Sequence, residues 1–436
     1  MNSTRAAFAL SFCAAASIGC RSLQSDTNLA SDYGGLPPSS IQQAQTANAL
    51  PPAWVQLGPA GVVMVKVLTT ASTCPTLSLG GSTLAMTARS APTAAFSVLV
   101  CQATLPAGTK AASLNGTSLN LPQANPRKIL VVGDTGCEIK QDKGKVKVQN
   151  CNDPQQWAWA QVAAAAAAEH PDLILHVGDY HYREVPCPDG ETKCSGAAVG
   201  DQWASWNQDF FIPAAPLLRA APWIFVRGNH ELCARAGNGW FYFLDPRPHP
   251  GACREDAQPY QVPVGNHSIA VIDSANGANV QVSLNNIAAP TGAILWLALH
   301  RPFITAGIDA EPTGAVPALP PNLRGSGKVG SVIAGHAHLL SLNTFANDAP
   351  PEMISGNGGT TLENSDLENN AISGVRTRAG FSATQFYDYG YLTLEQTNQA
   401  GQWSVVAHDR RSAPIFQCTL QEGLGVKTRL DCRAAP

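Results

Sequence analysis

The chain has 436 residues, 44% of them hydrophobic and 14% charged. It therefore has enough apolar material for two or three domains and too little charge for a disordered chain. The formal net charge of −3, from 28 basic and 31 acidic residues, leaves no strongly basic domain, and we expect no nucleic-acid partner. Plentiful glycine (38) and proline (32) indicate loops and short strands rather than a helical bundle.

Residues 1–19 are predicted to form a signal peptide. Arg5 supplies the positive start, residues 6–16 form an apolar stretch, and residues 17–20 form a cleavage site of small residues. Residues 20–50, rich in serine, glutamine and asparagine, predict a flexible tether. We therefore expect export, either to a bacterial cell envelope as a periplasmic or surface protein, or into the medium.

Cys20 stands where a bacterial lipobox has the cysteine that becomes lipidated. Three residues before that cysteine, a lipobox usually has leucine, and this chain has Ser17. An ordinary signal peptide cut near Ala16 is therefore the alternative. A lipid at Cys20 would be the sole membrane contact, because no uncharged apolar run of about eighteen residues follows the N-terminus.

Ten cysteines lie beyond the signal region, an even number typical of disulfide bonds in an exported protein. Sequence alone leaves their connectivity open, but they fall into five neighbouring pairs, each spanning a short loop. We hypothesise these five bridges: Cys74–Cys101, Cys137–Cys151, Cys187–Cys194, Cys233–Cys253 and Cys418–Cys432. A structural zinc site is the alternative, and the lack of any CxxC sequence argues against it.

Residues 51–124 predict a small all-β domain. Apolar, β-branched runs such as 62–67 and 96–100 are bounded by proline, glycine, serine and threonine. This region has no cluster of histidine, aspartate or glutamate, so we expect it to serve packing or positioning. Residues 121–126 read as the linker to a catalytic domain over 125–436.

From residue 128 onward, short apolar strands alternate with helices. A helix is predicted to begin at Asp153, with Pro154 at its first position, and to end near Glu169. The predicted strands are 128–132, 173–177, 223–226, 269–272, 294–299, 329–334, 391–394 and 403–407. Continuous apolar strands between helices predict an α/β fold with its sheets covered on their faces.

Polar residues follow five of these strands at the point where each strand ends. The segments are Gly133-Asp134, Gly178-Asp179-Tyr180-His181-Tyr182, Gly228-Asn229-His230-Glu231, Leu299-His300 and Gly335-His336-Ala337-His338. Ligands of α/β sheets bind at the carboxyl ends of strands. Carboxylate, amide and phenol oxygens together with imidazoles suit first-row metals, and they are too many for one zinc ion. Two ions that share a carboxylate would use them all.

In this order, the motifs GD, GDxxY, GNHE, H and GHxH resemble those of the calcineurin-like metallophosphoesterases, over about residues 128–410. Most members have Asp-x-His at the first motif, where this chain has Gly136 in place of the histidine, and they lack a tyrosine at the position of Tyr182. In both respects, the missing histidine and the added tyrosine, the chain resembles the purple acid phosphatases. The resemblance implies a β-sandwich flanked by helices.

The resemblance also implies the metal ligands. It assigns one ion, Fe(III), to Asp134, Asp179, Tyr182 and His338. It assigns a second, divalent ion of iron, zinc or manganese to Asp179, Asn229, His300 and His336, with Asp179 as the bridge.

The implied reaction is attack of a hydroxide on a small-molecule phosphate ester, with a monoester as the leading substrate. His230 would protonate the leaving group, and Glu231 would orient His230. Arg183 and Arg301 stand beside ligands and could hold phosphate, with a solvated arginine as the alternative for each. Two other functions stay open, a phosphodiesterase on the same ions and a non-catalytic surface binding protein that keeps a metal. An intact His230 argues against the second of these.

Overall fold

The computed structural model describes residues 50–303, 319–325, 327–363, 374–378 and 381–434. The predicted signal peptide, Cys20 and the predicted tether up to residue 49 lie outside these residues. Within the described part, no helix is both long enough and apolar enough to cross a membrane.

The larger of the two main sheets has eleven strands, in the order β25-β24-β23-β22-β9-β12-β13-β1-β2-β6-β5. Its centre consists of three parallel strands, namely β9 (Lys128–Val132), β12 (Leu173–His176) and β13 (Trp223–Phe225). An antiparallel C-terminal group continues it, namely β22 (Gly390–Gln396), β23 (Gln402–Asp409), β24 (Pro414–Gly423) and β25 (Val426–Ala434).

The second main sheet has eight strands, in the order β14-β15-β16-β17-β19-β18-β21-β20. Its strands are β14 (Tyr260–Val264), β15 (His267–Val271), β16 (Ile294–Ala298), β17 (Val329–Ala334), β18 (Leu340–Phe345), β19 (Glu352–Ser355), β20 (Gly374–Arg378) and β21 (Phe381–Phe386). The predicted strands 128–132 and 329–334 coincide with β9 and β17, and the other predicted strands of this region overlap observed ones.

Alternating side chains of the strands pack on opposite faces of each sheet. Ile129 and Val131 of β9 join a core between the two sheets, together with Trp296 and Ile333 from the second sheet. Leu130 and Val132 of β9 face a separate core that contains helical residues. The two sheets therefore form a sandwich with helices on its outer faces.

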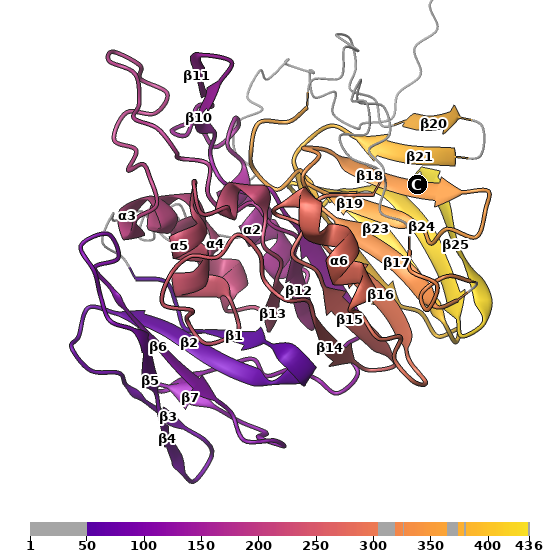
Figure 1. Cartoon of the computed structure of the whole chain (residues 1–436), viewed down its shortest axis with the longest axis horizontal. Coiled ribbons are helices and arrows are strands. Elements are labelled where there is room, and N and C mark those ends of the chain that lie inside the picture. The colour runs from indigo at the N-terminus through magenta and orange to yellow at the C-terminus, as the bar shows by residue number, and fades with distance from the viewer. Residues whose placement is uncertain (1–49, 304–318, 326, 364–373, 379–380, 435–436) are drawn as a thin grey trace, which may run out of the picture. The chain divides into compact units, whose positions relative to one another are not determined.

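Helices cover both outer faces (Figure 1). The first sheet carries α2 (Trp159–Ala168), α3 (Trp203–Trp206), η2 (Asn207–Phe211), α4 (Ile212–Leu218), α5 (Gly237–Gly239) and η4 (Trp240–Leu244). The second sheet carries α6 (Val280–Asn285), which follows the short turn η5 (Gly277–Asn279). The predicted fold class is confirmed.

The Ala-rich helix begins later than its sequence indicated. Asp153 caps a turn instead of the helix, because its carboxylate accepts the Gln155 backbone N–H at 2.9 Å. The indole of Trp157 donates to the Thr135 carbonyl at 2.9 Å and ties this turn to the loop after β9. The helix α2 therefore starts at Trp159 and not at Asp153.

The all-β region before the catalytic part has two components. Its first component extends the eleven-stranded sheet through β1 (Trp54–Leu57), β2 (Val63–Thr69), β6 (Leu99–Thr104) and β5 (Thr87–Ser90), with β1 parallel to β13. Its second component is a separate sheet of β3 (Thr76–Ser78), β4 (Thr83–Ala85), β7 (Ser113–Leu114) and β8 (Thr117–Ser118). The predicted boundary at residue 124 stays a prediction.

Buried polar side chains of this region bind the end of helix η4. Lys66 donates to the carbonyls of Phe243 and Asp245 at 2.9 and 3.0 Å. Arg89 donates to the carbonyl of Phe241 at 2.9 Å. Because the last carbonyls of a helix have no partner within it, side chains that donate hydrogen bonds to them stabilise that end of the helix. This contact gives the all-β region the packing role that its composition predicted.

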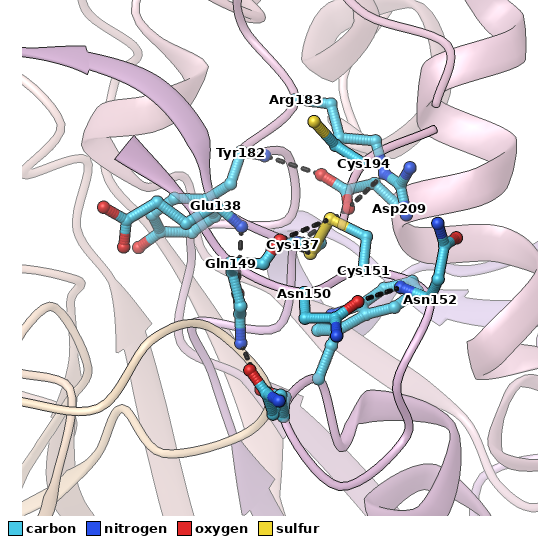
Figure 2. Close-up of a disulfide and its surroundings, with 12 residues drawn as sticks. Cys137, Glu138, Gln149, Asn150, Cys151, Asn152, Tyr182, Arg183, Cys194 and Asp209 are labelled. Carbon is cyan, nitrogen blue, oxygen red and sulfur yellow. Dashed lines mark hydrogen bonds and ion pairs between the residues drawn. A yellow bond between two sulfur atoms is a disulfide. The ribbon is translucent and has the colours of Figure 1, made fainter. Parts of the chain in front are cut away.

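All five hypothesised disulfide bridges are present, and each joins the predicted pair. Cys137–Cys151 closes the base of a hairpin formed by β10 (Ile139–Asp142) and β11 (Lys145–Val148). Figure 2 shows this bridge beside Asp209, which binds both Arg183 and the backbone N–H of Tyr182.

Candidate metal centre

The polar segments predicted from sequence meet at one rim of the sandwich. Asp134, Asp179 and Asn229 follow β9, β12 and β13 of the first sheet. His300 and His336 follow β16 and β17 of the second sheet. Because the strands within each of these sets run parallel, their carboxyl ends lie side by side, and the two sets meet across the sandwich.

The backbone is strained where this rim places its ligands. Asp134, Asp179 and His336 have φ angles of 56°, 58° and 70°, in the left-handed region that non-glycine residues seldom adopt. Two glycines allow close approach: a Cβ on Gly178 would lie 2.5 Å from His300 Nδ1, and one on Gly228 would lie 2.1 Å from Asp179 Oδ1. The loops are built to bring these side chains together.

Four of the predicted ligands form one donor group around the phenol of Tyr182. Its hydroxyl lies 2.8 Å from Asp179 Oδ2, 3.0 Å from His338 Nε2 and 3.3 Å from Asp134 Oδ1. His338 Nε2 lies 3.6 Å from Asp134 Oδ1. All four are the residues assigned to the first ion.

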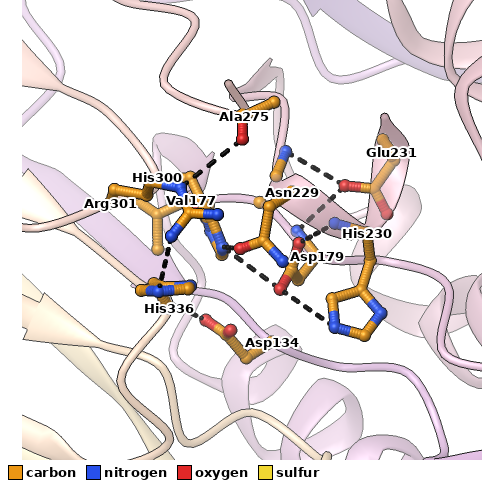
Figure 3. A network of polar contacts seen from close by, with 12 residues as sticks. Asp134, Val177, Asp179, Asn229, His230, Glu231, Ala275, His300, Arg301 and His336 are labelled. Atoms are coloured by element: carbon orange, nitrogen blue, oxygen red, sulfur yellow. Dashed lines mark hydrogen bonds and ion pairs between the residues drawn. The ribbon is translucent and has the colours of Figure 1, made fainter. Parts of the chain in front are cut away.

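A second donor group surrounds the ring of His300. Its Nε2 lies 3.0 Å from Asn229 Oδ1 and 3.1 Å from Asp179 Oδ2. Side-chain donor atoms of Asp179, His300 and His336 all lie within 4.8 Å of one another. Figure 3 shows the Asp179 carboxylate between His300 and His230, with Asn229 and His336 nearby.

The two groups share one atom, Asp179 Oδ2. This oxygen contacts both the Tyr182 hydroxyl and His300 Nε2. The residues therefore fit two adjacent ions with a common carboxylate, because each group offers four donors of the types that first-row metals bind.

Burial of two carboxylates also indicates a cation here. Asp134 and Asp179 have 0% and 1% of their surface exposed. Burial and the charge of Asp179 raise the pKa of Asp134 well above its usual range. Burial would also raise the pKa of Asp179, but His300 and His230 outweigh it and hold that pKa well below its usual range. Burying such charges is costly unless they are paired or bind a metal.

Backbone carbonyls fix the orientation of two imidazoles. His300 Nδ1 donates to the Val177 carbonyl at 2.8 Å, and His338 Nδ1 donates to the Thr361 carbonyl at 2.8 Å. With Nδ1 protonated in each ring, Nε2 carries the free lone pair and points at the donor groups. Metal-binding histidines use this arrangement to fix their tautomer.

His230 lies next to both donor groups but belongs to neither. Its ring packs on Tyr182 with the centroids 3.6 Å apart, and its Nε2 is 3.9 Å from Asp179 Oδ2. Its backbone N–H donates to Asp179 Oδ1 at 2.8 Å. Burial lowers the pKa of His230 to about 4, against the opposing effects of Asp179 and Glu184.

Glu231 does not orient the His230 ring, which corrects the prediction. Its buried carboxylate accepts backbone N–H groups at 2.9 to 3.2 Å, from Gly228, Asp179, Tyr180 and His181. Its side chain therefore holds the second and third motifs together. Burial and the charge of Asp179 raise the pKa of Glu231 to about 8.

The residues that contact the His230 ring were missed in the sequence. Glu184 Oε1 lies 2.7 Å from His230 Nδ1 and 2.6 Å from Arg235 Nε. Arg235 Nη2 lies 2.7 and 2.8 Å from the two ring nitrogens. Glu184 and Arg235 each stand five residues beyond a motif residue, Asp179 and His230. That position is the one signal that could have drawn attention to them.

Arg183 and Arg301, which the sequence places beside predicted ligands, have different surroundings in the structure. Arg183 is buried in an ion pair with Asp209 at 2.9 Å, so it neither holds phosphate nor lies in solvent, and both predicted alternatives were wrong. Arg301 lies at the site, with its Nη1 3.0 Å from His336 Nε2. A phosphate contact of Arg301 stays a prediction.

Comparison with known proteins agrees with this fold. Residues 127–340 match the model of the calcineurin-like phosphoesterase family. No curated protein matches the chain in sequence.

Two solved structures have a similar fold at low sequence identity. A purple acid phosphatase, PPD1 from seeds of yellow lupin (Lupinus luteus), is 14% identical, with a TM-score of 0.50 over 82% of this chain and 72% of the lupin chain. A structure of PhoD is 13% identical, with a TM-score of 0.52 over 87% of this chain and 91% of that one.

The fold and the rim of oxygen and imidazole donors define a metallophosphoesterase. Residues 127–340 of the chain belong to the calcineurin-like phosphoesterases. Membership implies hydrolysis of phosphate esters with divalent metal ions.

Proposed function

We propose that this chain is an exported acid phosphatase that hydrolyses phosphate monoesters at a pair of metal ions. The observation that carries the proposal is the position of Asp179 Oδ2, which is 2.8 Å from the Tyr182 hydroxyl and 3.1 Å from His300 Nε2. One carboxylate oxygen shared by two donor groups is the arrangement that two adjacent ions require.

The donors suggest which ion each group would hold. The Tyr182 phenol, deprotonated, is a hard anion suited to Fe(III), and it stands with two carboxylates and one imidazole. The group around His300 has two imidazoles and an amide, which suit divalent iron, zinc or manganese. When bound, such a pair would acidify water and neutralise charge on the phosphate.

The remaining residues of the site would position these donors and move a proton. Glu231 fixes the backbone that carries Asp179, through the Asp179 N–H at 3.1 Å. His230 would protonate the oxygen of the leaving group, since its ring stands beside both donor groups and ligates neither. Glu184, 2.7 Å from Nδ1 of that ring, would hold the ring in place.

The proposal of export rests on two features. The N-terminal pattern is that of a signal peptide, and five disulfide bridges in the described chain suit an oxidising compartment. Whether Cys20 carries a lipid would be decided by labelling the bacterial protein with a radioactive lipid precursor and comparing it with Cys20→Ala.

The function would be tested on the purified chain with its native metals. We expect about two metal ions per chain by elemental analysis, a visible absorption band from tyrosinate bound to Fe(III), and faster release of 4-nitrophenol from its monoester than from its diester. A faster diester reaction would make the chain a phosphodiesterase. Metal-loaded protein that cleaves neither ester would contradict the proposal and favour a binding protein.

A further inference from the structure

A lysine-rich hairpin stands beside the candidate metal centre and takes no part in it. Four of the ten lysines in the chain lie within the ten residues 139–148, at positions 140, 143, 145 and 147. The hairpin is made of β10 and β11, and Figure 1 shows it standing away from both main sheets. Its charge is therefore not needed to build the core.

The base of this hairpin is fixed to the donor group around Tyr182. The backbone N–H of Ile139 donates to the Tyr182 carbonyl at 3.0 Å, and the ammonium of Lys140 lies 5.6 Å from the Tyr182 ring centroid. The Cys137–Cys151 bridge closes the base, and Cys151 N–H donates to the Lys193 carbonyl in the loop closed by Cys187–Cys194.

Strand register places three of the lysines on one face of the hairpin. Lys140 is directly opposite Lys147, and the next pair on that face is Asp142 with Lys145. Because side chains alternate between faces along a strand, all of these lie on the face from which Lys140 reaches Tyr182. The opposite face carries Ile139, Gln141, Val146 and Val148.

Ion pairs with nearby carboxylates neutralise only part of the positive charge on this face of the hairpin. Lys147 pairs with Asp142 at 2.8 Å, and Lys140 lies 3.5 Å from Glu138. Lys145 is exposed and forms no ion pair among the described residues. Lysines directly opposite one another repel, so the arrangement favours an anion brought from outside.

We propose that this face binds a second phosphate group of the substrate, so that the preferred substrates are small esters with two or more phosphates. This rests on the proposed function. The pair of Lys140 with Lys147 and the pair of Asp142 with Lys145 are two residues apart, about 7 Å along the strands. The first of these pairs begins beside Tyr182. The second phosphate would therefore lie about one sugar length from the phosphate that is cleaved.

The test compares fructose 1,6-bisphosphate with fructose 1-phosphate, which differ by one phosphate group, on the metal-loaded full chain. We expect kcat/KM to be about tenfold higher for the bisphosphate at low salt, and this ratio to fall toward one at 0.3 M salt because exposed charges are screened. The double variant Lys145→Gln/Lys147→Gln should lower the ratio about tenfold.

Lys143→Asn is the matched control, because it removes a lysine charge at the turn and asparagine tolerates the φ of 47° found there. It should leave the ratio within about twofold of the wild type. A wild-type ratio near one, or an equal fall in the ratio for the control and the double variant, would overturn the proposal. If the wild-type protein had no activity on 4-nitrophenyl phosphate, that result would instead count against the proposed function itself.

Discussion

The two main sheets supply different chemistry to the same rim. The first sheet places oxygen donors, from Asp134, Asp179 and Asn229, after its parallel strands. The second sheet places imidazoles, from His300, His336 and His338, after its own. Neither sheet alone offers a complete ligand set for either proposed ion. The difference shows that the site depends on how the two sheets pack, which their shared apolar core determines.

The strongest test of this comparison removes the oxygen that both donor groups share. Asp179→Asn should lower kcat by about a thousandfold or more, since stabilisation by metal ions is worth several kcal/mol. It should also leave less than one equivalent of metal bound by elemental analysis. Asp256→Asn, an exposed aspartate, is the control and should keep both metal and activity. Full metal content in Asp179→Asn would refute the shared-ligand arrangement.

Removal of His230 should separate proton transfer from metal binding. His230→Ala should lower kcat on 4-nitrophenyl phosphate by about 10²- to 10³-fold, a typical loss for a general acid. The metal content should stay unchanged, because the ring ligates neither proposed ion. The comparison variant is His249→Ala, a histidine outside the site, which should match wild-type turnover. Loss of metal in His230→Ala would mean that the ring is a ligand.

A smaller effect should distinguish the two donor groups from each other. Tyr182→Phe removes a ligand of the first group alone, so it should abolish the visible band and lower activity by about 10- to 100-fold. His336→Ala removes a ligand of the second group alone, so the band should persist while about one equivalent of divalent metal is lost. An equal loss of the visible band in both variants would contradict the claim that the two donor groups hold separate ions.

The smallest expected effect on activity lies far from the rim, in the all-β region. Lys66→Ala leaves the buried carbonyls of Phe243 and Asp245 without their donor. It should lower the free energy of unfolding by about 2–4 kcal/mol, measured by urea denaturation, with a small change in kcat. The exposed Lys110→Ala is the control. Unchanged stability in Lys66→Ala would mean that the all-β region packs independently of helix η4.

Local patterns in the sequence were enough to predict much of the fold and which polar side chains meet at the rim. Strand β9 and strand β17 could be predicted to the residue, because each is a largely apolar run that is followed directly by glycine. The five disulfides could be predicted because each closes a short loop. The candidate ligands stood out because they follow strands, and the structure brings all seven together.

Features that depend on contacts between distant segments could not be predicted. The Asp153-Pro154 pattern of a helix start was overridden by the tie between Trp157 and Thr135. Glu184 and Arg235 gain their role only when the loops after the second and third motifs meet at His230. The parallel pairing of β1 with β13 joins segments more than 150 residues apart, and no local pattern signals it.

The central claim is best tested by a crystal structure of the native, metal-loaded protein, with anomalous diffraction measured at the iron edge and at a second metal edge. Two anomalous peaks about 3.5–4 Å apart, with Asp179 Oδ2 bound to both, are the predicted result. A single peak, or a pair of peaks with Asp179 bound to one of them alone, would contradict the claim that this oxygen joins the two donor groups.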